Sequence, residues 1–223
     1  MAKKVFVVGT GRCGTGAIAQ SFSGHHEYGI WYKFFNIPSN NNIVNVLFEP
    51  KNPKKYVFSD TVKNRELVDS WFGKHPSLGD KAMQVDFLDA DNSLSHVITE
   101  LYEKFDNAKF VLLVRDGRDY ATSAANRNWH TYDCLDHKPL PHEEFYGDWD
   151  DMSIIQKNAW SWVYKNTRCL NKLESIPKEQ KLIFKIEDSK YDDKIKELES
   201  FTEMKCDVNT LRHGKVNSNT ILS

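Results

Sequence analysis

The sequence lacks the features of a membrane protein and of a nucleic-acid-binding protein. No stretch approaches the roughly 20 consecutive apolar residues that span a bilayer, and the beginning, MAKKVFVVGTGRCG, has neither the apolar core nor the cleavage site of a secretory signal. The 30 Lys and Arg residues nearly balance the 31 Asp and Glu residues, so the net charge is −1. The protein therefore has no overall positive charge that would attract nucleic acid. We therefore expect a cytoplasmic protein with no membrane span and no nucleic-acid partner, whose anion binding comes from local sites.

The sequence also lacks the residue spacings that are typical of metal-binding sites. The four cysteines, at positions 13, 134, 169 and 206, include no Cys-x-x-Cys pair, and reduced thiols are the simplest interpretation. No dense group of carboxylates indicates a dedicated metal cage. The sequence also has no internal repeat, low-complexity block or linker, and its 223 residues suit one domain. We expect no metal and a single domain over residues 1–223.

Short apolar runs alternate with amphipathic stretches along the chain. Strands are expected at 4–8, 108–116 and 181–188. Helices are expected at 14–23, 61–73, 93–105, from about 120, and at 153–174 and 192–202. Residues 24–60 and 130–151 have weak periodicity and are expected to be mostly irregular. This alternation predicts an α/β fold with a central parallel sheet flanked by helices.

The first strand leads directly into the glycine-rich segment GTGRCGTG, residues 9–16. A strand, a tight glycine turn and a helix N-terminus together present backbone N–H groups to an anion. The glycines allow the backbone to approach a ligand closely, and Arg12 adds a charged donor. The phosphate loop of nucleotide triphosphatases ends in Gly-Lys-Ser/Thr, whereas here Gly14 is followed by a threonine and a glycine. The alternative is a simple turn whose arginine faces solvent.

A second anion site is predicted in the segment VRDGRDYATS. Arg115 ends an apolar strand, and Ser123 follows eight residues later in the next helix. Because the carboxyl ends of parallel strands meet at the ligand crevice, Arg115 is expected to point toward the first loop. The alternative is a solvated charge cluster, in which Arg118, Asp119 and Arg127 pair along the surface.

The two segments together resemble the sulfotransferases that use 3′-phosphoadenosine-5′-phosphosulfate (PAPS). GTGRCGTG is similar to their 5′-phosphosulfate loop, GxxRSGT, with Cys13 in place of the serine. Arg115 and Ser123 are similar to the arginine and serine of their 3′-phosphate site. LGDKAMQ looks like their GDKTP segment, and KIEDSKYDDKIKELESF looks like their YEDL segment. The resemblance touches four places between residues 9 and 201, in the order of the family.

The resemblance implies which residues bind the cofactor. The phosphosulfate loop would contribute Gly11, Arg12, Cys13, Gly14, Thr15 and Gly16, and the 3′-phosphate would meet Arg115 and Ser123. Family members commonly close a late basic loop over the nucleotide, which here implies contacts from Arg212, Gly214 and Lys215. A frayed polar C-terminus is the alternative for that last segment.

The resemblance also implies two catalytic cations, Arg12 and Lys81, and no metal. A transferred sulfuryl group carries less negative charge than a phosphoryl group, so Mg²⁺ is not required. What is needed is a fixed positive charge near the bridging oxygen as the nucleotide leaves. Arg12 is in the position of the family's loop cation, and Lys81 lies in the segment that resembles GDKTP.

The sequence offers several candidates for the general base. An acceptor hydroxyl must lose a proton to a group within hydrogen-bond reach, and the family often places a glutamate about twenty residues past the loop cation. This chain has Trp31 and Tyr32 there. We select Glu49 as the catalytic base because it ends the apolar run NVLF. Glu27, His25 and His26 stay open as alternatives.

The expected function is therefore that of a PAPS-dependent sulfotransferase acting on a hydroxyl or amine of a small-molecule or carbohydrate acceptor. A P-loop nucleotide kinase or triphosphatase is the first alternative, although the chain lacks its lysine at position 15 and its metal-binding hydroxyl at position 16. A nucleotide-binding paralogue without catalysis is the second. The identity of the acceptor and the oligomeric state stay open.

Overall fold

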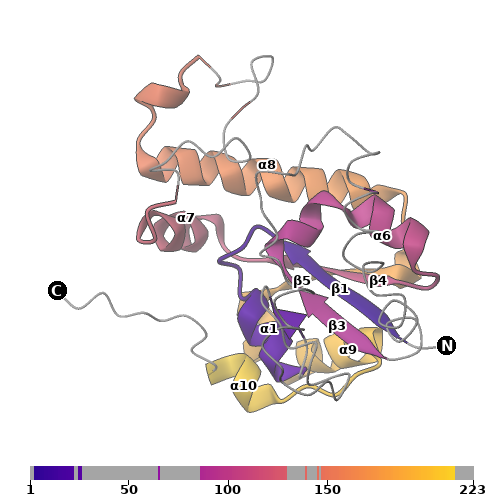
Figure 1. Ribbon diagram of the computed structural model, residues 1–223. Coiled ribbons are helices and arrows are strands. Elements are labelled where there is room, and N and C mark those ends of the chain that lie inside the picture. Colours follow the sequence, from indigo (N-terminus) through magenta and orange to yellow (C-terminus); the bar gives the residue numbers. More distant parts are fainter. Residues whose placement is uncertain are drawn as a thin grey trace, which may run out of the picture.

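Five parallel strands form the central sheet of the computed structural model, which describes residues 3–22, 25–26, 65, 86–129, 139, 145 and 147–213. The strands are β1 (Lys4–Gly9), β2 (His25–His26), β3 (Phe87–Ala90), β4 (Lys109–Val114) and β5 (Lys181–Lys185). Their order in the sheet is β2-β3-β1-β4-β5, and each neighbouring pair is parallel; Figure 1 labels all of these strands except β2. The predicted α/β fold with a central parallel sheet is confirmed.

The register between β1 and β4 determines where a site can form. Val5 pairs with Lys109 and Gly9 pairs with Leu113, so the two strands end side by side. Every residue of β1 is buried, as expected for a parallel strand that is covered on both faces. The chain therefore leaves β1 for the glycine-rich loop close to the point where it leaves β4 for Arg115.

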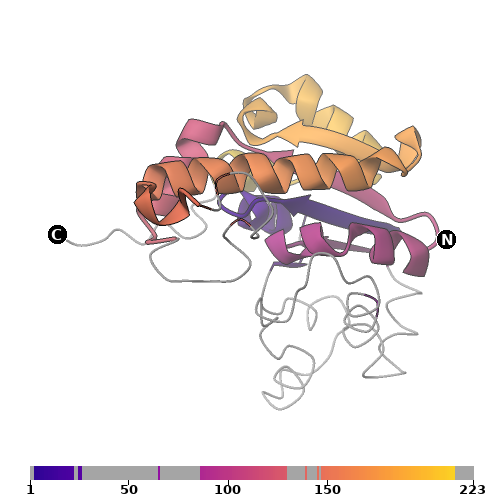
Figure 2. The ribbon, with the colours of Figure 1, turned by 90° about the horizontal axis from the view of Figure 1, so that it is seen from above.

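Helices cover both faces of the sheet (Figures 1 and 2). One face is covered by the 3-10 helix η2 (Asn92–His96), by α6 (Ile98–Lys104) and by the long helix α8 (Ile154–Glu174). The other is covered by α1 (Thr15–Ser21), α9 (Asp192–Thr202) and α10 (Val208–His213). Helix α7 (Gly117–Ala125) follows β4 and packs against α8. The described residues also contain the 3-10 helices η4 (Trp149–Asp151), η5 (Lys178–Gln180) and η6 (Ile186–Lys190).

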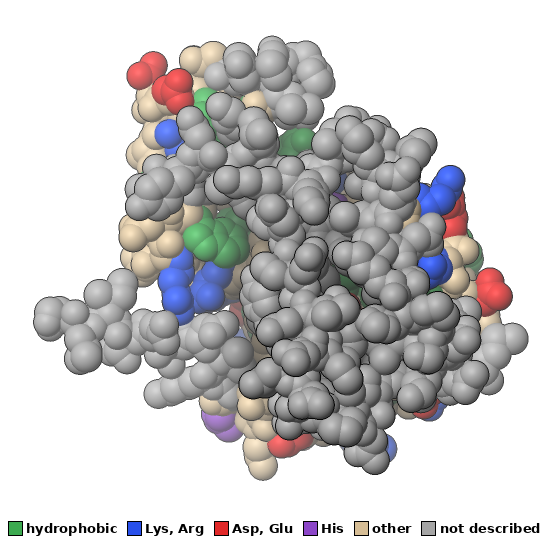
Figure 3. All heavy atoms as spheres, viewed as in Figure 1, with side chains coloured by type: hydrophobic (Ala, Val, Ile, Leu, Met, Phe, Trp, Pro, Cys, Tyr) green, Lys and Arg blue, Asp and Glu red, His purple; other side chains and the backbone are tan. Residues whose placement is uncertain are grey.

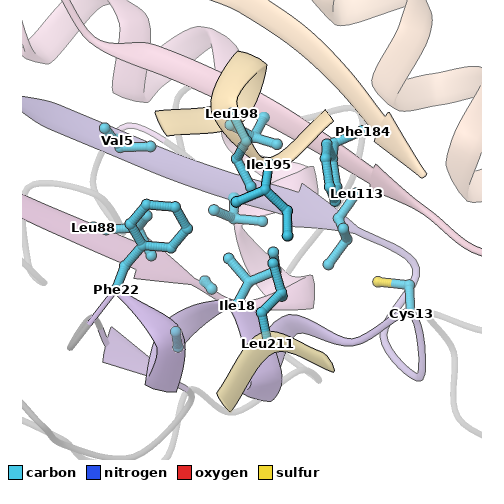
Figure 4. Close-up of a cluster of buried hydrophobic side chains, with 14 residues drawn as sticks. Val5, Cys13, Ile18, Phe22, Leu88, Leu113, Phe184, Ile195, Leu198 and Leu211 are labelled. Atoms are coloured by element: carbon cyan, nitrogen blue, oxygen red, sulfur yellow. The ribbon is translucent and has the colours of Figure 1, made fainter. Parts of the chain in front are cut away.

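Alternation along β1 divides its side chains between two buried clusters. Phe6 faces α6 and α8, and its ring centroid lies 5.5 Å from that of Phe105 and 5.6 Å from that of Phe110. Val5 and Val7 face the opposite cluster, to which α1, α9 and α10 contribute (Figure 4). Because apolar burial on both faces stabilises the strand, the base of the glycine-rich loop is held from two sides.

Several predicted helices are confirmed with slightly different ends. The helices expected at 14–23, 153–174 and 192–202 are α1, α8 and α9. The helix expected from about residue 120 begins earlier, at Gly117. The physical reason is the Asp116 carboxylate, which caps this helix by accepting a hydrogen bond from the Arg118 backbone N–H at 2.9 Å.

Other predicted boundaries were wrong. The strand expected over 181–188 ends at Lys185 and continues as η6, and the helix expected over 93–105 is divided into η2 and α6. Strand β3 was not predicted, because it is only four residues long and includes an aspartate. The elements expected within 27–64 and 66–85, apart from the helical Arg65, lie outside the described residues, and the limits 1–223 of the domain stay a prediction.

The part of the chain that the structure describes has no helix of the length and apolar content needed to cross a membrane.

Replacing Gly9 with alanine should destabilise the protein, because β1 and β4 approach too closely for a side chain. A Cβ atom at Gly9 would lie 2.6 Å from the Leu113 carbonyl oxygen and 2.9 Å from Cys13 Sγ. Since the first of these is a backbone atom inside the sheet, the strands must shift, at a cost of about 1–3 kcal/mol. Urea denaturation measures this loss in the free energy of unfolding. Gly147→Ala is the matched control, since nothing lies within 4 Å of its Cβ position; equal stabilities of the two variants would contradict the expectation.

Candidate functional site

The loop after β1 turns through three residues with positive φ: Gly11 (+76°), Arg12 (+47°) and Gly14 (+100°). Glycine adopts this left-handed conformation without steric cost, whereas an arginine rarely does. Gly14 is the N-cap of α1 and, having no side chain, leaves the N–H groups of the first helical turn to other partners. The loop thus combines a tight turn with a helix start, which is the backbone arrangement expected of an anion site.

Residues from three other elements enclose this loop. A Cβ atom at Gly11 would lie 2.7 Å from Asn92 Nδ2 and 2.8 Å from Trp129 Cη2. A Cβ atom at Gly14 would lie 2.9 Å from Ile186 Cγ1. Asn92 begins η2, Trp129 follows α7 and Ile186 begins η6. Glycine is therefore required at both positions for close packing as well as for its backbone conformation.

The base of the loop is held by Ser95 and by the buried Cys13. Ser95 Oγ accepts a hydrogen bond from Gly9 N at 3.0 Å and donates one to Gly9 O at 2.7 Å. The Cys13 side chain is fully buried and belongs to the core beneath the loop (Figure 4). Burial raises the pKa of the Cys13 thiol, although the Thr10 hydroxyl partly opposes this effect. The thiol is therefore protonated, and position 13 can meet a ligand only through its backbone.

Three of the predicted site residues come together at the ends of β1 and β4. Arg115 Nη1 donates a hydrogen bond to the Arg12 carbonyl oxygen at 3.0 Å, across 103 positions of sequence. Arg12 Nε donates to Ser123 Oγ at 3.2 Å, across 111 positions. The prediction that Arg115 points toward the first loop is confirmed. Two guanidinium groups and a hydroxyl are thus joined to the glycine-rich loop in one place.

The backbone that carries Arg115 is itself held by neighbouring side chains. Trp162 Nε1 donates to the Arg115 carbonyl oxygen at 3.0 Å, and Glu187 Oε1 accepts from Asp116 N at 3.0 Å. The Asp116 carboxylate also pairs with the exposed guanidinium of Arg118, at 2.8 Å between Oδ2 and Nη2, which holds the pKa of that carboxyl well below its usual range. Arg115 therefore lies at a rigid junction between strand and helix.

An aromatic cluster lies beneath this junction. Tyr120 is fully buried, with the Trp129 and Trp162 rings packed against it. The Tyr120 and Trp129 rings meet edge to face, with centroids 6.3 Å apart. Burial raises the pKa of Tyr120 to about 12. The Lys165 ammonium, on the buried face of α8, lies 5.9 Å from the centroid of the Trp129 ring. The cluster thus supports the loop through Trp129 and the Arg115 backbone through Trp162.

Arg212 makes its hydrogen bonds elsewhere at this end of the sheet. Its Nε donates to Ser189 O at 2.8 Å, and its Nη2 lies 2.5 Å from the carboxylate of Asp192. These contacts attach Arg212 to η6 and to the start of α9. A nucleotide would have to exchange them, so the cofactor-binding role of Arg212 stays a prediction.

The other predicted site residues are not placed by the structure. Gly214 and Lys215 of the late basic loop, the second cation Lys81 and the proposed base Glu49 lie outside the described residues. So does the alternative base Glu27, while His25 and His26 are described only as the backbone of β2.

Sequence reasoning missed some residues that the structure adds to the site. Asn92 and Trp129 gave no signal, since neither belongs to a recognisable motif. Glu187 lies in KIED, the segment that resembles the YEDL segment of sulfotransferases, but no contact with the Arg115 junction was foreseen. Trp162 likewise belongs to no motif, and its indole N–H donates to the Arg115 carbonyl oxygen, whereas Trp160 stacks on Tyr164.

This arrangement has the donors that an anion site needs, with one cation from each of two segments. Backbone N–H groups and Arg12 suit one anionic group, and Arg115 with Ser123 suits a second. Figure 3 shows Lys and Arg side chains gathered beside an apolar side chain on this face of the molecule, to the left of the view. The protein as a whole has a net charge of −1, so the attraction for anions is local.

Comparisons with known proteins identify the family of the chain and its fold. A family model described as a sulfotransferase domain matches residues 4–190. Among solved structures, the chain is similar to the sulfotransferase domain from the curacin biosynthetic pathway, with 13% identity over 96% of this chain and 87% of that chain and a TM-score of 0.57. It is also similar to the sulfotransferase domain from the Synechococcus PCC 7002 olefin synthase, with 12% identity over 93% of this chain and 75% of that chain and a TM-score of 0.51. No curated protein matches the chain.

At such low identities the two structures establish the fold alone. The family model carries the assignment, because it spans well over half of the chain and includes the glycine-rich loop, the Arg115 junction and the KIED segment. The chain belongs to the sulfotransferase family.

Proposed function

We propose that the protein transfers a sulfuryl group from PAPS to a hydroxyl or amine of an acceptor. The observation that carries this proposal is the convergence of Arg12, Arg115 and Ser123 at the ends of β1 and β4. A donor with anionic groups at both its 5′ and 3′ ends matches two cations from two separate segments. A nucleotide with phosphate at one end only would leave one of them without an anion.

The two arginines are held together by contacts that an anion could exchange. Arg115 donates to a backbone carbonyl oxygen and Arg12 to a neutral hydroxyl. A guanidinium that binds phosphate gains attraction to its negative charge and often makes two parallel hydrogen bonds, neither of which a neutral carbonyl or hydroxyl provides. A 3′-phosphate next to Ser123 would therefore compete effectively for the Arg115 guanidinium, while the loop backbone and Arg12 bind the 5′-phosphosulfate.

The proposed reaction is an in-line displacement at sulfur. The acceptor oxygen or nitrogen forms a bond to sulfur, the bond between sulfur and the bridging oxygen breaks, and 3′,5′-adenosine diphosphate leaves. We assign Arg12, with Lys81 as a second cation, to the negative charge that develops on the leaving oxygen. Glu49 is the proposed base that accepts the proton of the acceptor. The independence from metal stays a prediction, as do the small-molecule or carbohydrate acceptor and a cytoplasmic location.

The alternative functions differ in the ligand that they require. A nucleotide kinase would use a lysine at the end of the loop, where this chain has Thr15 and Gly16. A non-catalytic paralogue would bind the nucleotide through the same arginines without transferring sulfuryl. Ligand binding therefore separates the first alternative from our proposal, and transfer assays separate the second.

The bisphosphate 3′,5′-adenosine diphosphate should stabilise the protein without any metal. At a roughly hundredfold excess over its dissociation constant, we expect a gain of about 2.7 kcal/mol in the free energy of unfolding. Thermal denaturation with the bisphosphate, with ATP and with Mg²⁺-ATP in parallel provides the measurement. Stabilisation by Mg²⁺-ATP but not by the bisphosphate would favour the kinase-like alternative.

Arg115→Ala should weaken binding of the bisphosphate much more than binding of 5′-AMP. A charge-assisted contact worth roughly 1.5–3 kcal/mol is lost, and only the bisphosphate carries the 3′-phosphate that makes it. Calorimetric titration of both nucleotides measures the difference. Arg118→Ala is the control, because this arginine lies three residues further along the chain, in the first turn of α7, and its side chain is 92% exposed. Equal losses for both nucleotides in Arg115→Ala would mean that Arg115 does not bind the 3′-phosphate.

Arg12→Ala should slow the chemical step more than it weakens binding. Backbone N–H groups bind the 5′-phosphosulfate with or without the arginine, whereas charge on the leaving oxygen develops only in the transition state. We expect single-turnover transfer to fall by roughly 10²–10³, with nucleotide affinity changed by less than about tenfold. Arg12→Lys should recover part of the rate, because a point charge suffices without a guanidinium fork. An alanine variant that transfers normally once saturated would reduce Arg12 to a binding residue.

A further inference from the structure

The peptide bond between Arg115 and Asp116 lies where β4 gives way to α7, and it is bonded on both sides. Its carbonyl oxygen accepts from Trp162 Nε1 at 3.0 Å, and its N–H donates to Glu187 Oε1 at 3.0 Å. The C=O and N–H of a trans peptide point in opposite directions, and the described residues contain no cis peptide. A donor from α8 and an acceptor from η6 therefore hold one peptide group from opposite sides.

The Trp162 ring is fixed in turn by its packing. It lies against the cluster of Tyr120, Ala121 and Ala124. A Cβ atom at Gly117 would lie 3.2–3.3 Å from three carbons of the indole, so the ring rests directly on the first turn of α7. The direction of the indole N–H is thereby set, and it points at the Arg115 carbonyl oxygen.

The place of this peptide group fixes the Cα atom from which the Arg115 side chain extends. If the group shifts, the Arg115 Cα shifts with it, and the guanidinium at the end of the side chain moves relative to the loop. The Arg115 guanidinium reaches the Arg12 carbonyl oxygen, so the contacts run without interruption from Trp162 and Glu187 through Arg115 to the glycine-rich loop.

We propose that Trp162 and Glu187 are positioning residues for Arg115, and that their two hydrogen bonds set the affinity of the site for the 3′-phosphate of the nucleotide. This inference rests on the proposed function, in which Arg115 meets that phosphate. Neither residue touches the ligand; both act through the peptide group that they hold.

The test compares Trp162→Phe with Trp160→Phe. Phenylalanine at 162 keeps an aromatic ring on α7 but removes the N–H donor. Trp160 is the matched control, because it lies two residues away on the same helix and stacks on Tyr164 at 4.6 Å, away from the Arg115 junction. Trp162→Phe should weaken the binding of 3′,5′-adenosine diphosphate by about tenfold and the binding of 5′-AMP by less than about twofold. Trp160→Phe should leave the ratio of the two dissociation constants unchanged.

A double-mutant cycle with Arg115→Ala separates positioning from a general loss of structure. If Trp162 acts through Arg115, the substitution Trp162→Phe should have no further effect on bisphosphate affinity once Arg115 is alanine. If Trp162 only supports the fold, Trp162→Phe should weaken the binding of both nucleotides equally, whether position 115 is arginine or alanine.

Glu187 provides a second, independent test, which can be carried out even if Trp162→Phe fails to fold. Because Glu187 is exposed, its substitution should not prevent folding. Glu187→Ala should lower the preference for the bisphosphate, and Glu187→Gln should restore most of it, since an amide oxygen still accepts from Asp116 N. A wild-type protein that binds both nucleotides equally overturns the proposed function, and with it this inference. A wild-type protein that prefers the bisphosphate, together with unchanged preferences in Trp162→Phe or in Glu187→Ala, overturns the inference alone.

Discussion

The parallel pairing of β1 with β4 is the constraint on which the candidate site depends. Because Gly9 lies opposite Leu113, the segments that leave the two strands emerge together. Arg12 and Arg115 meet for this reason, although 103 positions separate them. The pairing is held by apolar side chains on both faces of the sheet. A core substitution on either face that disturbs the pairing of these strands would therefore alter the site. It would do so without changing any residue that binds a ligand.

Two arginines at the same end of the sheet repel one another electrostatically, and the fold holds each of them in a defined direction. The Arg12 carbonyl oxygen orients the guanidinium of Arg115, and the Ser123 hydroxyl orients that of Arg12. Repulsion between like charges is relieved when an anion lies between them. The same two contacts thus hold the site in shape before a ligand arrives and can be exchanged when it does. The aromatic cluster of Tyr120, Trp129 and Trp162 supplies the rigid support for this arrangement.

The sequence predicted those parts of the site that rest on local pattern. The apolar runs before GTGRCGTG and before Arg115 are buried parallel strands, and their carboxyl ends meet as such strands do. Contacts between distant segments had no local signal. Nothing in the sequence joins Trp162 to the Arg115 carbonyl oxygen or Glu187 to Asp116 N, because hydrogen bonds to the backbone leave no motif. For Cys13 the sequence indicated a place in the loop but not the burial of its side chain. That burial follows from the turn, which directs the thiol into the core.

The conformation of Arg12 shows how closely the site depends on that turn. A residue with a side chain at φ +47° is strained by about 1 kcal/mol or more, and such strain is typical of functional sites. Glycine at position 12 would relieve it, but the loop would lose its charged donor. In this conformation the two ends of Arg12 have different partners: its carbonyl oxygen accepts from Arg115, while its side chain reaches Ser123 on α7. One strained residue therefore connects both predicted anion sites, and a relaxed backbone at this position would have to give up at least one of those contacts.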